Sequence, residues 1–190
     1  EIWRYNGTAW SKIGGDGVSS SWNTNYEEVF VMRVYREKLI AGLGSGTDDA
    51  EVWAYDESTW EQVGGDDIGG SWTAATNERV RSMAIYNGEL YAGLGDTAGD
   101  GEVWRWNGSA WAKVAGDGVN SGWTSTIEYV SSLIDYKGKL DAGTGNTANA
   151  DAGVWSFGNN AFVSSSTDTH DSGWHHVAAT YDGANMKIFI

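Results

Sequence analysis

Residues 80–114 read VRSMAIYNGELYAGLGDTAGDGEVWRWNGSAWAKV, and this stretch decides the fold. Apolar and polar residues alternate over four short segments, which is the period of a β-strand with one buried face. Asn87-Gly88 and Asn107-Gly108 each separate two of these segments. Asn-Gly is a strong hairpin signal because a type I′ turn needs positive φ at both central residues. We expect an antiparallel meander of four strands, over 80–86, 89–94, 102–106 and 110–114.

The same unit recurs about four times along the 190 residues, at a spacing of 50 or 51 residues. Three aromatic series share one phase, and self-similarity at this period is typical of propellers and repeat arrays. The series are Trp3, Trp53, Trp104 and Trp155; Trp10, Trp60, Trp111 and Phe162; and Trp22, Trp72, Trp123 and Trp174.

The sequence begins and ends midway through a unit. Segments 2–5 and 9–13 match third and fourth strands, whereas 177–181 and 186–190 match first and second strands. Pairing the two halves would close a ring without an open sheet edge. We therefore predict an all-β fold, a small β-propeller of four blades with four antiparallel strands each, in which the terminal half-blades pair within a single domain, 1–190. An open piece of a longer array is the alternative.

Two features of each unit resemble kelch repeats: the run VWAYD at 52–56 with Trp60, and hairpins such as YNGELYAG at 86–93. The second strand departs from the kelch pattern, since it ends in AGLG at 41–44 and not in a plain double glycine. The resemblance covers every unit. It implies a propeller that binds a partner, without implying an activity.

A second resemblance is local. The run GWHHVAATYDG at 173–183, followed by MKIFI at 186–190, is similar to laminin-G-like (concanavalin-A-like) jelly-roll domains, which often bind sugars. Only about twenty residues match, far fewer than a jelly roll contains. We favour a propeller hairpin here, because it supplies the missing half-blade. The alternative is propeller repeats over 1–165 and the start of a truncated laminin-G-like domain over 166–190.

The composition excludes several classes of partner. The chain has 12 basic and 26 acidic residues, and its net charge of −14 repels nucleic acid and anionic lipid. No apolar run is long enough to span a membrane, so we expect no membrane insertion. With no cysteine, disulfides and thiolate zinc sites are excluded. The first residues carry no signal peptide, yet we expect an extracellular or cell-surface protein; its oligomeric state does not follow from the sequence.

The loop after each fourth strand combines aspartate, glycine and tryptophan. A carboxylate accepts hydrogen bonds from sugar hydroxyls, and an indole stacks on the C–H face of a sugar ring. The alternative is that each tryptophan wedges between blades and each Asp-Gly makes a turn. We predict ligand-binding residues at Asp16, Trp22, Asp66, Trp72, Asp117 and Trp123.

Other polar clusters carry weaker predictions. The acidic loops 47–49, 96–102 and 146–151 offer oxygen ligands of the kind that Ca²⁺ takes, but they share no ligand spacing. We therefore predict no cofactor, with Ca²⁺ as the minor alternative, and no other metal. Glu27, Glu78 and Glu128 stand eight residues before the tyrosines that end the first strands. We expect them to form a solvated rim.

Nothing in the sequence amounts to a catalytic motif, so we predict no enzyme. Glycoside hydrolysis needs an asymmetric acid and base, whereas symmetric repeats give copies of one carboxylate. The function we predict is lectin-like, multivalent carbohydrate binding through the repeated Asp-Gly-Trp loops. The alternative is a protein-interaction scaffold of kelch type, so the partner is a glycan or a protein.

Overall fold

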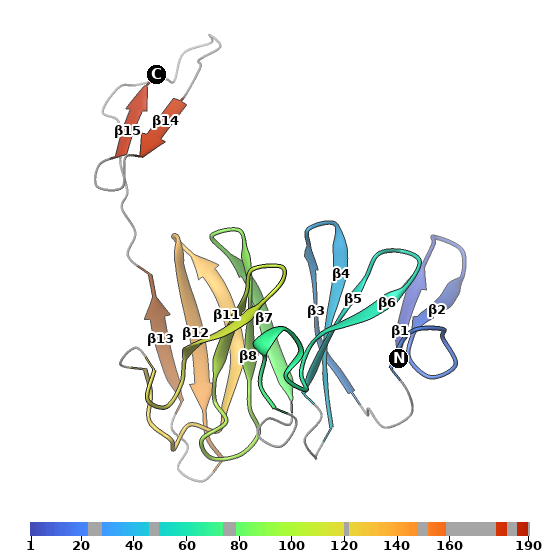
Figure 1. Ribbon diagram of the computed structural model, residues 1–190, viewed down its shortest axis with the longest axis horizontal. Helices are drawn as coiled ribbons and strands as arrows, with labels where there is room; N and C mark the ends of the chain where they lie inside the picture. The colour runs from blue at the N-terminus through green and yellow to red at the C-terminus, as the bar shows by residue number, and fades with distance from the viewer. Residues whose placement is uncertain are drawn as a thin grey trace. The chain divides into compact units, whose positions relative to one another are not determined.

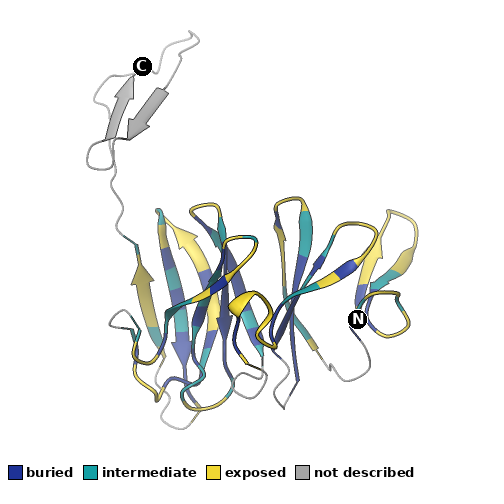
Figure 2. Cartoon of the chain, in the orientation of Figure 1, coloured by how far each residue is buried: buried dark blue, intermediate teal, exposed yellow. Residues whose placement is uncertain are grey.

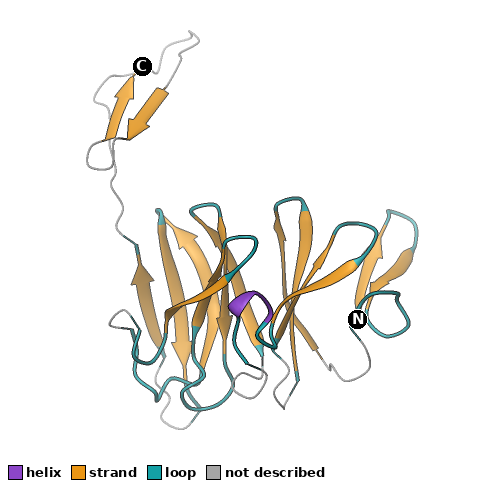
Figure 3. Ribbon diagram, viewed as in Figure 1, coloured by secondary structure: helices purple, strands orange, loops and turns teal. Residues whose placement is uncertain are grey.

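The computed structural model describes residues 1–22, 28–45, 50–73, 79–119, 122–147, 152–158, 178–181 and 186–189. In these ranges the regular elements are β-strands, apart from one turn of 3₁₀ helix, η1 (Ile68–Gly70) (Figure 3). None of the helices within them is long and apolar enough to cross a membrane. The chain divides into two compact units, Glu1–Phe157 and Gly158–Ile190.

The first unit contains four antiparallel sheets, which stand in chain order (Figure 1). Consecutive strands are neighbours in every sheet, so the first sheet is a hairpin and the other three are meanders. The first sheet has β1 (Ile2–Tyr5) and β2 (Trp10–Gly14); the second has β3 (Glu28–Tyr35), β4 (Lys38–Gly44), β5 (Glu51–Tyr55) and β6 (Trp60–Gly64); the third has β7 (Val80–Tyr86), β8 (Glu89–Leu94), β9 (Val103–Trp106) and β10 (Trp111–Ala115); the fourth has β11 (Tyr129–Tyr136), β12 (Lys139–Gly145) and β13 (Gly153–Phe157).

The turns between first and second strands have the geometry that the sequence predicts. Tyr86 pairs with Glu89 across a two-residue turn. Asn87 and Gly88 have φ of 49° and 76°, both left-handed as a type I′ turn requires. The four-stranded meander predicted for residues 80–114 is therefore confirmed, with strand ends shifted by one residue in β9 and β10.

The core lies between neighbouring sheets. Strands β3, β7 and β11, the first strands of three sheets, contact one another in series (Figure 1). One apolar cluster joins Ile2 of the first sheet to Leu43 of the second, and another joins Ile40 of the second to Leu90 of the third. The longest continuous buried segments lie on β4 and β8, the second strands of the two four-stranded sheets (Figure 2). Each sheet thus needs its neighbour to bury an apolar face.

The second unit contains one described hairpin, β14 (Ala178–Tyr181) paired antiparallel with β15 (Met186–Phe189). The all-β class and the antiparallel sheets are confirmed. The closed ring stays a prediction, since β1–β2 and β14–β15 are separate two-stranded sheets. The fourth strand expected at 161–163 lies outside the described residues. Both predicted domain divisions stay predictions as well.

Candidate functional site

The tryptophans of the predicted binding loops are buried. Trp22, Trp72 and Trp123 expose only 4%, 2% and 4% of their surface. The indole Nε1–H of Trp72 donates to the carbonyl of Ala50 at 2.6 Å, and that of Trp123 donates to Gly101. A buried indole with a satisfied N–H is a packing group. In this structure the three rings are not open to a sugar, and the binding role predicted for these residues stays a prediction.

These rings pack on tryptophans of the next sheet. Trp22 meets Trp60 edge-on, with ring centroids 5.0 Å apart, and Trp72 meets Trp111 in the same way at 5.2 Å. Edge-to-face geometry is favourable for aromatic pairs. The repeated tryptophan is thus part of a joint between sheets, which was the structural alternative for this loop.

The aspartates of the same loops are on the surface. Asp16, Asp66 and Asp117 are all exposed. Asp66 has a left-handed φ of 53°, and its Oδ2 accepts a hydrogen bond from Nε2 of Gln62 at 3.4 Å. The structure therefore separates the two halves of the predicted site. The carboxylates face solvent, while the indoles lie inside.

A repeated Glu-x-Trp pattern fixes other tryptophans and was missed by the sequence reasoning. Nε1–H of Trp104 donates to Oε2 of Glu102 at 2.6 Å, and Trp53 bonds Glu51 in the same way at 2.5 Å. Glu102 also forms an ion pair with Lys113. A glutamate two residues before Trp3, Trp53 and Trp104 was the available signal. The Glu-x-Trp pattern indicates how the indole ring is oriented and does not indicate a ligand.

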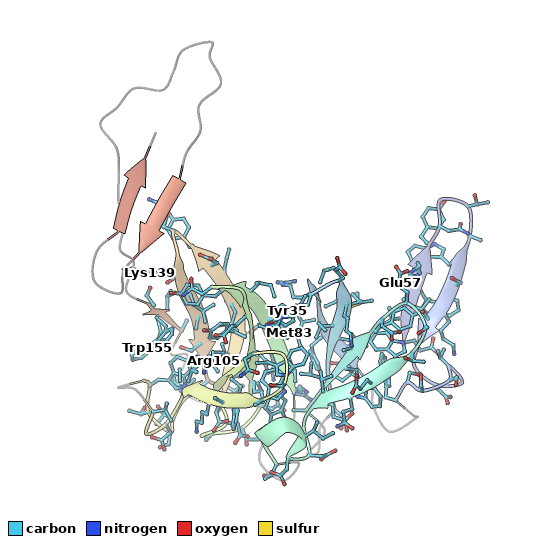
Figure 4. The ribbon with its side chains drawn as sticks, turned by 45° about the horizontal axis from the view of Figure 1, so that its top comes forward. Tyr35, Glu57, Met83, Arg105, Lys139 and Trp155 are labelled. Carbon is cyan, nitrogen blue, oxygen red and sulfur yellow. The ribbon has the colours of Figure 1, made fainter. Side chains whose placement is uncertain are left out.

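A groove of about 290 Å³ lies between the second and third sheets. Four elements form it: the β3–β4 turn, β6, η1 and the β9–β10 turn. Figure 4 shows Tyr35 among the side chains between these sheets. Its polar and exposed lining residues include Arg36, Lys38, Glu61, Gln62, Ile68 and Ser109.

The groove combines a packed aromatic wall with a polar rim. The rings of Tyr35 and Trp106 lie 5.6 Å apart and are both buried. The guanidinium of Arg36 lies 5.1 Å from the centre of the Tyr35 ring. On the second sheet, Nζ of Lys38 is 3.9 Å from Oε2 of Glu61, which is a loose and exposed ion pair of little energetic weight. These charges are therefore available to a ligand.

The loop that carries Asp66 and Trp72 contributes different residues to the groove. Its chain folds back at η1, where Ile68 N–H donates to the carbonyl of Gly65 at 3.0 Å. Gly69 has φ of 62°, and a Cβ at this position would lie 3.0 Å from the carbonyl oxygen of Ser109. Glycine thus lets the loop lie against the third sheet. The predicted loop borders the candidate site, but through Ile68 and Gly69.

In the acidic loop at 96–102, the carboxylate of Asp96 is already paired with arginine side chains. Asp96 forms ion pairs with both Arg79 and Arg81. The two guanidiniums stack on Phe30 and Tyr129, at 5.6 and 4.8 Å from the ring centres. In the part of the chain that the structure describes, no three His, Asp or Glu residues gather as metal ligands. Residues 47–49 and 148–151 of the other acidic loops lie outside that part, so the calcium alternative stays untested.

Glu128 differs from the solvated rim residue that we expected. It is buried, and its Oε2 accepts hydrogen bonds from the backbone N–H and the hydroxyl of Thr147, both at 2.8 Å. It therefore ties the start of β11 to the loop after β12. Glu27 and Glu78 lie outside the described residues.

Comparison with known proteins finds no match to this chain among protein-family models, curated proteins or solved structures. The kelch and laminin-G resemblances therefore rest on the residues quoted for them alone. The function has to be argued from the groove and from the faces of the sheets.

Proposed function

We propose that this chain is a non-enzymatic binding module that holds a carbohydrate in the groove between its second and third sheets. The observation that carries the proposal is the groove of about 290 Å³, rimmed by hydrogen-bonding side chains from separate elements. Small-molecule sites begin at about this volume, near 300 Å³. A groove of this size accommodates a short segment of an oligosaccharide.

The rim suits a ligand rich in hydroxyls. Gln62 and Ser109 can each donate and accept hydrogen bonds, Lys38 donates and Glu61 accepts. A sugar hydroxyl also donates and accepts hydrogen bonds, so each hydroxyl of a ligand can bond to one of these side chains. The groove is one site and not three. At the equivalent positions of the next sheet, Asn87 replaces Arg36 and Ala112 replaces Glu61.

We propose further that the sheets are blades of a small propeller. Contacts between successive first strands, β3, β7 and β11, support a radial arrangement. In the four-bladed form the terminal half-blades would pair, and strands in a pair have Cα atoms about 5 Å apart. Since the chain has no cysteine, spin labels on cysteines introduced at Arg4 and Ile188 test this directly. Closure predicts one short distance, and a long or broad distribution would contradict it.

Glycan binding tests the proposed function. The wild type should bind a neutral oligosaccharide at about millimolar Kd, or about 4 kcal/mol. Replacing Glu61 and Gln62 by alanine should abolish binding and leave the melting temperature unchanged. The matched control is Ser11→Ala with Lys12→Ala, at the same strand positions of β2, which should bind normally. A wild type that binds nothing on a broad glycan array at millimolar concentrations would contradict the proposal.

A second candidate, the interaction scaffold, is favoured by the first sheet. Its outer side chains Trp3, Tyr5 and Trp10 are 50%, 53% and 65% exposed. The occupant that fits is another sheet of the same repeat, because that is what covers Trp60 at the same position one unit later. Acrylamide quenching of Trp10 fluorescence, with the other tryptophans replaced by phenylalanine where stability allows, measures its cover. Trp10 quenched as readily as free indole at every protein concentration would contradict this candidate.

A further inference from the structure

The β3–β4 turn beside the groove is strained. Arg36 and Glu37 have φ of 47° and 64°, a region that side chains other than Asn, Asp and Gly rarely adopt. The corresponding turns of the third and fourth sheets are Asn87-Gly88 and Lys137-Gly138, each with glycine at the second position. The second sheet therefore keeps a turn that costs stability, although a relaxed version exists in the same chain. Such outliers cluster at functional positions.

The turn sends the Arg36 side chain across to the third sheet. Its guanidinium stacks on Tyr35 and lies against Gly108 in the β9–β10 turn. A Cβ on Gly108 would overlap Nη1 of Arg36, so the glycine makes room for the guanidinium. The charged group is thus held at the edge of the groove by contacts from both sheets.

Arg36 differs from three of the other five arginines, Arg79, Arg81 and Arg105, in having no charged partner. Among the residues that the structure describes, its guanidinium makes no hydrogen bond or ion pair. Arg79 and Arg81 share Asp96, and Arg105 lies 3.6 Å from Glu89. Arg4 stacks on Tyr55 at 5.6 Å in a similar way, but it does not line the groove. Arg36 therefore offers its planar set of donors to whatever enters the groove.

We propose that Arg36 receives a carboxylate of the ligand, so that the glycan bound in the groove carries a sugar acid. This inference rests on the proposed function and names its ligand class. A guanidinium binds a carboxylate through two parallel hydrogen bonds. Lys38 and Glu61 belong to the same sheet as Arg36. Lys38 adds a second positive charge, and Glu61 disfavours a ligand that carries a second negative charge. A singly charged carboxylate also suffers less repulsion from a chain of net charge −14 than a phosphate group does, which carries nearly two negative charges.

The test compares two ligands that differ in one carboxylate: an aldobiuronic acid and its carboxyl-reduced, neutral counterpart, both measured by titration calorimetry. The wild type should bind the acid about tenfold more tightly. Arg36→Ala should remove that preference, whereas the control Arg4→Ala should keep it. Equal binding of the two ligands by the wild type, or a preference that survives Arg36→Ala, would overturn the inference and leave the proposed function standing. No binding of either ligand would overturn both.

A second variant guards against a loss that merely reflects damage to the fold. Arg36→Asn with Glu37→Gly installs the turn sequence of the third sheet. This double variant should melt at a higher temperature than the wild type, because it removes two strained φ angles, and it should still lose the preference for the acid. A lower melting temperature, or an unchanged preference, would contradict a strained turn kept for ligand binding.

Discussion

Trp60 and Trp111 occupy the same strand position as Trp10, yet their surroundings differ. Trp60 and Trp111 are 4% and 5% exposed, whereas Trp10 is 65% exposed. Nε1–H of Trp60 donates to the carbonyl of Ile13 at 2.6 Å, and that of Trp111 donates to Val63 at 2.7 Å. Both bonds reach the preceding sheet. The difference teaches that this tryptophan is buried by its neighbour, and not by its own sheet.

Glycines mark the covered joints. Gly14 ends β2, and a Cβ there would lie 3.0 Å from the rings of Trp22 and Trp60. Gly64 ends β6, and a Cβ there would lie 2.8 Å from Nε1 of Trp111. The tryptophan of one sheet therefore rests on the bare backbone of the sheet before it. A substitution that displaces the tryptophan from this glycine should weaken the packing between the two sheets.

The largest expected effect separates the two kinds of tryptophan. Trp111→Ala should lower the free energy of unfolding by about 3–5 kcal/mol, because it empties a buried aromatic site. Trp10→Ala should cost less than about 1 kcal/mol with the first sheet uncovered as in this structure, because exposed substitutions cost little. Urea unfolding followed by circular dichroism measures both. Similar losses for the two variants would break the comparison.

A smaller effect is expected from filling the joint. Gly64→Ala places a methyl group against the indole of Trp111 and should destabilise the chain by about 1–3 kcal/mol, the usual cost of overpacking. Ala115 stands at the same position of the third sheet, so Ala115→Gly is the matched control, with a cost of about 1 kcal/mol or less. If Gly64→Ala has the same urea midpoint of unfolding as the wild type, residue 64 and Trp111 are not in close contact.

The Glu-x-Trp pairs sharpen the comparison further. Glu102→Gln keeps a hydrogen-bond acceptor for Trp104 but removes the ion pair with Lys113. The side chain of Glu102 is only 13% exposed. We expect a loss of about 1 kcal/mol. Glu1→Gln changes the equivalent pair on the uncovered sheet, where Lys12 lies 2.9 Å from the carboxylate, and should have no measurable effect on the urea midpoint. An equal shift for both variants would show that cover by a neighbouring sheet does not matter here.

The smallest expected effect depends on pH. Hydrogen bonds from the backbone N–H of Thr59, and then from Ser58, lower the pKa of Asp56 well below its usual range. A pKa that is lowered in the folded state makes that state more stable at pH values above the ordinary pKa of about 3.9. This added stability is lost as the pH falls below that value. Between about pH 4 and pH 2 the wild type should thus lose slightly more stability than Asp56→Asn, which keeps the acceptor, as Asn107 does on the third sheet. Parallel melting curves against pH would contradict this assignment.

The sequence could predict what depends on local chemistry. Asn87-Gly88 and the alternating pattern were enough for the meander, because turn type and strand period act over a few residues. The Asp-Gly-Trp loops were ambiguous, because an indole that stacks on a sugar and one that packs on the next sheet leave the same pattern. The groove could not be predicted from the sequence. It depends on Arg36 meeting Gly108 across two sheets, which no local pattern records.

Hydrogen exchange of the indole N–H groups, followed by NMR, tests the central claim that buried tryptophans join neighbouring sheets. Trp60 and Trp111 each donate to a backbone carbonyl of the preceding sheet. Such bonds should open only when two sheets separate, so their exchange should be far slower than that of free indole. The account predicts slow exchange at both positions. Exchange of Trp60 or Trp111 as fast as free indole under native conditions would contradict it.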